Sequence, residues 1–85
     1  MKQFEYEIVD ELGLHTRPAG LMVKEASRFC CAIQLECKGK SGSAKKLFNV
    51  MAMGAKKGDR LVVRCEGEDE DAAAEAMEAF CRHNL

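Results

Sequence analysis

Hydrophobic and polar residues alternate in three stretches of the chain, at about residues 2–9, 31–37 and 60–65. Alternation with a period of two is the pattern of a β-strand with one buried face. A tight turn at residues 38–40 leads from the second stretch into a short fourth strand at about residues 40–43. The pattern therefore predicts four strands, two of them joined as a hairpin.

Three further stretches have hydrophobic residues at the spacing of an amphipathic helix. The first runs from about Thr16 to Phe29. Pro18 fits the first turn of a helix but not its interior, so this helix should begin just before Pro18, with His15 at the N-cap. Its expected hydrophobic positions are Ala19, Met22, Val23, Ala26 and Cys30.

The second helical stretch is short and spans about residues 47–54. We expect Ser43 or a neighbour to cap its start and Gly54 to end it. The third begins at about Asp69, with acidic residues at its start and basic residues at its end, the order that suits the helix dipole. Its expected buried stripe consists of Ala73, Ala76, Met77 and Phe80.

The predicted order of elements is β-α-β-β-α-β-α. Strands with one hydrophobic face need cover on that face only. We predict an α+β fold of the open-faced β-sandwich type, in which a four-stranded antiparallel sheet carries three helices on one face. At 85 residues, the chain should form one domain over residues 1–85.

Composition excludes several functional classes. The contents of 47% hydrophobic and 32% charged residues suit a soluble globular protein, and no apolar run has the length of a membrane span or the layout of a signal peptide. We therefore expect a cytoplasmic protein with no direct membrane insertion. The five cysteines lack zinc-site spacing, so no metal and no cofactor is expected. Buried free thiols are favoured, and a redox role of the adjacent Cys30 and Cys31 is the alternative.

Charge is unevenly distributed along the chain. Residues 38–64 include eight basic residues and one acidic residue, whereas residues 66–78 include seven acidic residues and no basic one. The basic region could attract an acidic partner. Nucleic acid is not the expected partner, because the sequence has no aromatic stacking platform and no nucleic-acid-binding motif.

The start of the first predicted helix has candidate chemistry. Backbone N–H groups are free at a helix start, and the helix dipole favours an anion there. Arg17 adds a planar set of donors, and a histidine can form a covalent intermediate. A phosphoryl group on His15 would thus meet both backbone amides and Arg17. The alternative is that His15 is only a helix cap.

These residues resemble a known family. The stretch Gly13-Leu14-His15-Thr16-Arg17-Pro18-Ala19 is similar to the active-site signature of the histidine-containing phosphocarrier proteins, the HPr family, of the bacterial sugar phosphotransferase system. Similar segments at matching spacing cover essentially the whole chain. They are residues 23–26, 39–41, 44–48, Gly54, 57–59 and 66–67.

The resemblance implies a phosphoryl carrier rather than a stand-alone enzyme. Members accept a phosphoryl group from phosphorylated enzyme I on histidine Nδ1 and pass it to the IIA domains of sugar permeases. Carried over, His15 is the phosphorylation site, Arg17 is its charge partner, and the protein is a monomer. The implied partner-binding residues are Thr16, Gly20, Leu21, Lys24, Lys45, Lys46, Leu47, Phe48 and Met51.

Two positions depart from the family pattern. Most members have a serine at the position of Lys46, and in Gram-positive relatives a kinase phosphorylates it, so we predict no regulatory serine here. Leu12 stands where the family usually has a small polar residue, and its side chain cannot donate a hydrogen bond to a phosphoryl group. A paralogue with a regulatory or nitrogen-related phosphorelay role, and a binding module without phosphotransfer, are the alternatives.

Overall fold

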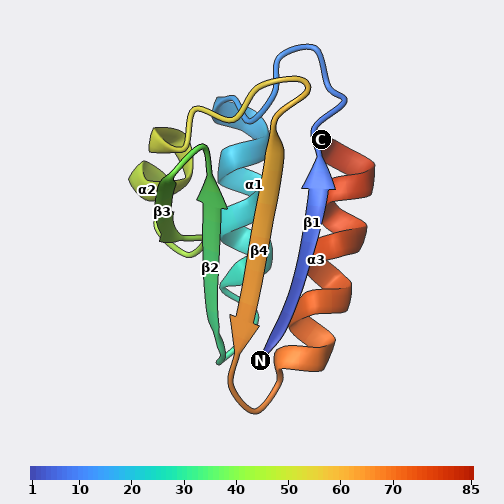
Figure 1. Cartoon of the computed structure of the whole chain (residues 1–85). Coiled ribbons are helices and arrows are strands. Elements are labelled where there is room, and N and C mark those ends of the chain that lie inside the picture. Colours follow the sequence, from blue (N-terminus) through green and yellow to red (C-terminus); the bar gives the residue numbers. More distant parts are fainter.

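Four strands form one antiparallel sheet in the computed structural model, which describes residues 1–85 (Figure 1). The strand order across the sheet is β1-β4-β2-β3, so β1 and β3 are the edge strands. The strands are β1 (Lys2–Glu7), β2 (Ala32–Cys37), β3 (Lys40–Ser43) and β4 (Arg60–Glu66). The helices are α1 (Thr16–Ala26), α2 (Leu47–Ala52) and α3 (Glu70–Asn84). The predicted element order and the α+β open-faced sandwich are confirmed.

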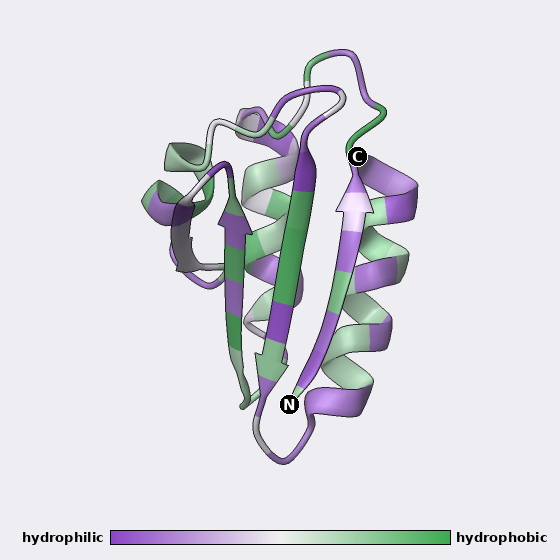
Figure 2. Cartoon of the chain, in the orientation of Figure 1, coloured by the Kyte–Doolittle hydropathy of each residue, from purple (hydrophilic) through white to green (hydrophobic).

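The three helices lie on one face of the sheet and leave the other face open (Figure 1). The register places Phe4 opposite Val63 and Val63 opposite Leu35, so neighbouring strands present hydrophobic side chains in one row on the covered face. Hydrophobic and hydrophilic residues alternate along β2 (Figure 2). The hydrophilic side chains lie on the open face and form charged pairs between strands, such as Arg64 with Glu36. None of the helices has the length and hydrophobicity that crossing a membrane would require.

Helix α1 ends at Ala26, before the predicted end at Phe29. The cause is a contact distant in sequence, because the carboxylate of Asp69 accepts the backbone N–H groups of Cys30 at 2.8 Å and Cys31 at 2.9 Å. These bonds hold the chain in a turn that leads into β2. The placement of Cys30 on the hydrophobic stripe of the helix was therefore wrong, because Cys30 is exposed.

The predicted cap of α2 was also wrong. Lys46 is the N-cap residue and its side chain makes no capping hydrogen bond. The Ser43 hydroxyl instead accepts the backbone N–H of Lys45 at 3.1 Å, in the turn before the helix. The helix ends at Ala52, before the left-handed Gly54 (φ +60°).

Helix α3 begins at Glu70, just after its N-cap Asp69. Ala73 and Met77 are buried as predicted, and the stripe continues through Cys81 to Leu85. Phe80 and Ala76 are only partly buried, because they lie beside this line of residues spaced by four. The predicted stripe is therefore confirmed at Ala73 and Met77, while Phe80 packs against the edge of the core and Cys81 takes the fully buried position.

All five cysteines are free. Cys37 and Cys65 are buried on the covered face of the sheet, as predicted, and Cys31 and Cys81 are buried as well. Burial raises the pKa of the Cys31 thiol to about 11 and that of Cys81 to about 12. Cys30 is exposed.

Candidate functional site

The loop before α1 fixes the position of His15 through a close approach to the loop before β4. Gly13 has a left-handed backbone (φ +64°), and a Cβ atom added there would lie 2.5 Å from the carbonyl oxygen of Ala55. The same oxygen accepts the backbone N–H of Leu14 at 2.9 Å. Only glycine fits this position without strain, so His15 follows a tightly packed turn.

Neither ring nitrogen of His15 makes a hydrogen bond. Nε2 faces an acidic group, with Oδ2 of Asp10 at 4.0 Å. The Asp10 carboxylate is held in turn by the backbone N–H of Leu12 at 3.1 Å. With 39% of its side chain exposed, the imidazole is accessible to another protein. The arrangement directs Nε2 towards an acidic group and leaves Nδ1 available to react.

The first turn of α1 places free donors next to this imidazole. Ala19 donates the first helical hydrogen bond, to the carbonyl of His15 at 2.9 Å. The backbone N–H groups of Thr16 and Arg17 precede it and have no intrahelical acceptor, while Pro18 has no N–H. Two amides at the positive end of the helix dipole are therefore available to an anion.

Arg17 has an unusual position among the arginines of the chain. Arg28, Arg60, Arg64 and Arg82 each bind a carboxylate, whereas Arg17 has no ion pair and no hydrogen-bond partner in the structure. A guanidinium with five free donors at a helix start can bind two oxygens of a phosphoryl group at once.

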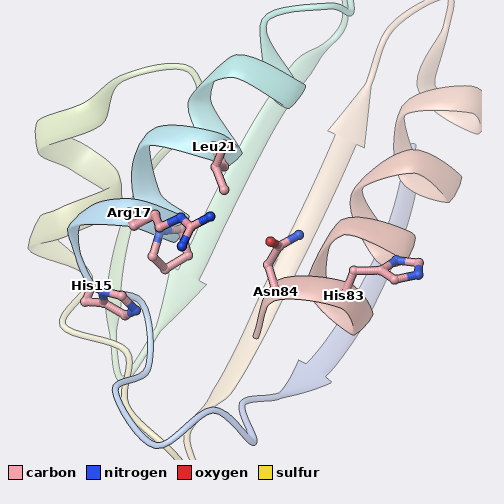
Figure 3. Close-up of a pocket in the computed structure, with 6 residues that line it drawn as sticks. His15, Arg17, Leu21, His83 and Asn84 are labelled. Carbon is pink, nitrogen blue, oxygen red and sulfur yellow. The ribbon is translucent and has the colours of Figure 1, made fainter.

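A pocket of about 270 Å³ lies between the start of α1 and the last turn of α3 (Figure 3). The residues that line it are His15, Arg17, Pro18, Leu21, His83 and Asn84. Neither His83 nor Asn84 is among the site residues predicted from the sequence. No sequence signal places them here, because only the packing of α3 against α1 brings the two helix ends together.

Together these features suit a transient phosphohistidine. A nucleophilic ring nitrogen, two free backbone amides and a guanidinium surround one small, accessible space, and the bond to the phosphoryl group would form at the imidazole. The site contains no cluster of side chains that could hold a metal ion. Its residues can bind and transfer a phosphoryl group only together with a partner that supplies it.

The sequence profile described as PTS HPr component phosphorylation site matches residues 2–83. The chain belongs to the HPr family. Phosphocarrier protein HPr of Mycoplasma capricolum subsp. capricolum is 40% identical over 77 residues, which cover 91% of this chain and 86% of that protein. Phosphocarrier protein HPr of Lysinibacillus sphaericus is 38% identical over 77 residues, which cover 91% of this chain and 88% of that protein.

A solved HPr structure has the same fold. The crystal structure of HPr-C-His from Thermoanaerobacter tengcongensis superimposes with a TM-score of 0.91 at 35% identity, covering 96% of this chain and 92% of that chain. Similarity of this extent in both sequence and structure places the chain among the HPr phosphocarriers of the phosphotransferase system.

Most of the residues expected at an HPr docking surface are exposed on α1 and α2, which contact each other. Leu21, Leu47 and Met51 are each 40% exposed, and Phe48 is 83% exposed. The other exposed residues of the expected surface are Thr16, Gly20, Lys24 and Lys46. We call these eight exposed residues the helical patch: Thr16, Gly20, Leu21, Lys24, Lys46, Leu47, Phe48 and Met51.

Lys45 is the exception among these expected residues. Its ammonium donates to the carbonyl oxygen of Phe29 at 2.6 Å, beyond the C-terminal end of α1, and the side chain is partly buried. The structure thus gives Lys45 a role in holding the start of α2 against the end of α1. Its charge is less available to steer a partner than that of Lys24 or Lys46, which are exposed.

Proposed function

We propose that this HPr-family protein is a phosphoryl carrier, which accepts a phosphoryl group from phosphorylated enzyme I on Nδ1 of His15 and passes it to IIA domains of sugar permeases. The observation that carries the proposal is the free Nδ1 of His15 at the start of α1, beside the one arginine without a partner. Family membership supports the same reaction class.

The reaction needs the His15 tautomer with a proton on Nε2. The Asp10 carboxylate beside Nε2 favours that tautomer, which leaves the lone pair of Nδ1 free to attack phosphorus. A nitrogen–phosphorus bond forms at Nδ1 while the bond between phosphorus and the donor breaks, and the electrons of that bond remain with the donor. The amides of Thr16 and Arg17 and the Arg17 guanidinium stabilise the charge on the phosphoryl oxygens.

Docking is proposed to use the helical patch. Phe48 supplies exposed apolar area, and Lys24 and Lys46 favour approach of an acidic partner. Because the transferred group sits at an accessible imidazole, the partner must supply the remaining contacts around phosphorus. We propose a cytoplasmic monomer that exchanges the phosphoryl group in transient complexes, without metal or cofactor of its own.

The test is phosphate acceptance by the purified protein. On addition of enzyme I and phosphoenolpyruvate, intact mass spectrometry should show one added, acid-labile phosphoryl group. His15→Ala should abolish the addition and keep the fold, measured by circular dichroism. His83→Gln is the matched control, because it removes the other histidine of the chain and should retain acceptance.

Other results would favour the alternatives. If the wild-type protein gains no phosphoryl group from active enzyme I, the proposed role in sugar transport is contradicted. Acceptance of a phosphoryl group from a nitrogen-related donor would then favour a regulatory paralogue. A protein whose partner binding is unchanged in His15→Ala and which accepts phosphate from no donor would be a binding module. Arg17→Ala should reduce the transfer rate at least tenfold, and a normal rate would contradict the role given to Arg17.

A further inference from the structure

Asp10 places a carboxylate beside the ring nitrogen of His15 that the proposed phosphotransfer leaves unmodified. Its Oδ2 lies 4.0 Å from Nε2, and no other carboxylate lies within 4.0 Å of a ring nitrogen of His15. In the proposed function Asp10 acts only on the tautomer of the free protein. The same carboxylate also faces the ring after phosphorylation, because Nδ1 and Nε2 lie on different sides of the imidazole.

Backbone hydrogen bonds fix Asp10 in this position. Its N–H donates to the backbone oxygen of Leu85 at 2.7 Å, and its carbonyl oxygen accepts the N–H of Gly13 at 3.0 Å. Its Oδ2 also accepts the N–H of Leu12 at 3.1 Å, which orients the carboxylate. The Leu85 side chain is 3% exposed and anchors this end of the chain in the core. The fold therefore holds the carboxylate near Nε2.

The other ionisable side chains around His15 do not supply a second negative charge at the ring. They are Arg17 from α1, His83 from α3, Lys56 from the loop before β4 and Glu11 from the same loop as Asp10. Arg17 and Lys56 are positive, and Figure 3 shows the His83 ring directed away from His15. Glu11 is 84% exposed and bonds to the Lys57 ammonium at 2.8 Å.

Release of the phosphoryl group depends on the proton at Nε2. When the bond between Nδ1 and phosphorus breaks, its electron pair returns to the ring. A ring that carries the Nε2 proton leaves as neutral imidazole, whereas a ring without that proton would leave as imidazolate, a far poorer leaving group. The phosphorylated ring is therefore reactive as an imidazolium, and a carboxylate next to Nε2 favours that positive charge.

We propose that Asp10 is a positioning residue that keeps the Nε2 proton on phosphorylated His15. With that proton in place, the acceptor of the phosphoryl group attacks phosphorus and neutral imidazole departs. The proton stays on Nε2 through the whole cycle, so Asp10 itself remains ionised. The inference deepens the proposed function and rests on it for the donor and the acceptor, but not for the effect of Asp10 on the phosphorylated ring.

The test follows hydrolysis of the phosphorylated protein as a function of pH. Every variant carries His83→Gln, so that His15 is the one histidine, and phosphoramidate serves as a chemical phosphoryl donor. NMR identifies the phosphorylated nitrogen. Hydrolysis should slow as the pH rises and the Nε2 proton is lost. In Asp10→Asn, which keeps an oxygen for the Leu12 N–H, this slowing should occur at lower pH.

The size of the effect should depend on pH. At about pH 8, Asp10→Asn should hydrolyse roughly threefold more slowly than the protein with Asp10, the size expected for one exposed ion pair. At about pH 5 the two rates should agree, because the ring is protonated in both. The ¹⁵N resonance of Nε2 should likewise show a smaller protonated fraction in Asp10→Asn at about pH 8.

Two further variants control for charge and for folding. Glu11→Gln removes the same charge from the same loop and should follow the parent protein at every pH. Asp10→Glu restores the charge and should hydrolyse faster at about pH 8 than Asp10→Asn. Thermal unfolding of each variant shows whether the loop is intact.

The outcomes distinguish this inference from the proposed function. A rate ratio that is the same at every pH, an equal response of Glu11→Gln, or a phosphoryl group on Nε2 would each overturn the role of Asp10, even in an active carrier. If enzyme I does not phosphorylate the protein while the chemically phosphorylated form shows the expected pH dependence, the role of Asp10 stands and the proposed carrier function fails.

Discussion

Gly13 and Ala55 lie so close that a single added carbon atom at Gly13 would meet the Ala55 carbonyl oxygen at 2.5 Å. The contact joins the loop that carries His15 to the loop that precedes β4. Neither partner of the clash can move alone, because the Ala55 oxygen also accepts the N–H of Leu14. The geometry of the loop before His15 therefore depends on the absence of a side chain at position 13.

Gly13→Ala should destabilise the fold by about 2–4 kcal/mol, since it adds left-handed strain to a backbone clash. It should also slow phosphate acceptance by His15. Gly54→Ala is the matched control, because Gly54 has a similar φ of +60° and no atom within 4 Å of its added Cβ. Its cost should be only the conformational strain, about 1 kcal/mol. Equal losses in urea unfolding would show that the contact with Ala55 does not matter.

Leu12→Asn should slow hydrolysis of the phosphohistidine by a few-fold. The Leu12 side chain is 70% exposed and near His15 in the chain, where an amide could donate to the phosphoryl group and a leucine cannot. The decay of the phosphorylated protein can be followed by intact mass at constant pH. Leu12→Ala is the control. If its phosphohistidine is hydrolysed as slowly as that of Leu12→Asn, the effect comes from removing the leucine and not from the added amide.

Phe48→Ser should weaken partner docking without affecting the fold. At 83% exposure, the ring contributes little to the core, so the unfolding midpoint should stay within about 2 °C of the wild type. The KM for phosphorylation by enzyme I should rise roughly tenfold, the effect of losing an aromatic docking contact. Val62→Thr, on the open face of β4, should leave the KM unchanged. A normal KM in Phe48→Ser would show that Phe48 does not contribute to docking of enzyme I.

Lys46 should not serve as a phosphorylation site. Incubation with a Gram-positive HPr kinase and ATP should leave residue 46 and Ser43 unmodified in peptide maps, because Lys46 has no hydroxyl group and Ser43 uses its own in the turn before α2. Lys46→Ser supplies the hydroxyl and should take up one acid-stable phosphate. Phosphate on Ser43 of the wild type would reveal a regulatory route that the sequence does not predict.

Asp69→Asn should reduce stability in a pH-dependent manner. The N–H of Cys30 is the largest cause that lowers the pKa of Asp69 below its ordinary value of 3.8. A lowered pKa in the folded state gives a stabilisation that is complete above the unfolded pKa and is lost as the pH falls through the folded one. The difference in Tm from the wild type should therefore be largest at neutral pH and shrink as the pH falls below the ordinary carboxyl pKa of 3.8.

The control for this pH profile is Glu68→Gln, which changes an exposed carboxylate that makes no hydrogen bond in the structure. Its Tm should follow that of the wild type across the whole range. If the difference for Asp69→Asn were instead constant with pH, the carboxylate charge would not be what fixes the start of β2.

Local patterns were sufficient to predict the elements and the order of the fold. The alternation in β4 and the position of Pro18 depend on neighbours in sequence, and the structure has both as predicted. The end of α1 could not be predicted in this way, because it is set by Asp69, which is distant in the sequence. The burial of Cys81 rather than Phe80 likewise depends on how α3 packs against the core, which neighbours in sequence do not determine.

The same distinction applies to the site. His15, Arg17 and the free helix start follow from one contiguous motif, and the structure places them together. The second wall of the pocket comes from Asn84, whose position depends on how α3 packs against α1. Lys45 was expected to face a partner, but its carbonyl acceptor at Phe29 belongs to a turn that the helical pattern did not predict.

The burial of four of the five thiols gives the protein a built-in attachment point for a probe. Cys31 and Cys81 are buried and have raised pKa values, and Cys37 and Cys65 are shielded by the sheet and its helices. A maleimide dye should therefore label Cys30 alone. Cys30 lies beyond the end of α1 opposite to His15, and the eleven-residue helix between them is about 16 Å long. Fluorescence anisotropy of the labelled protein could then report each docking event without obstructing it.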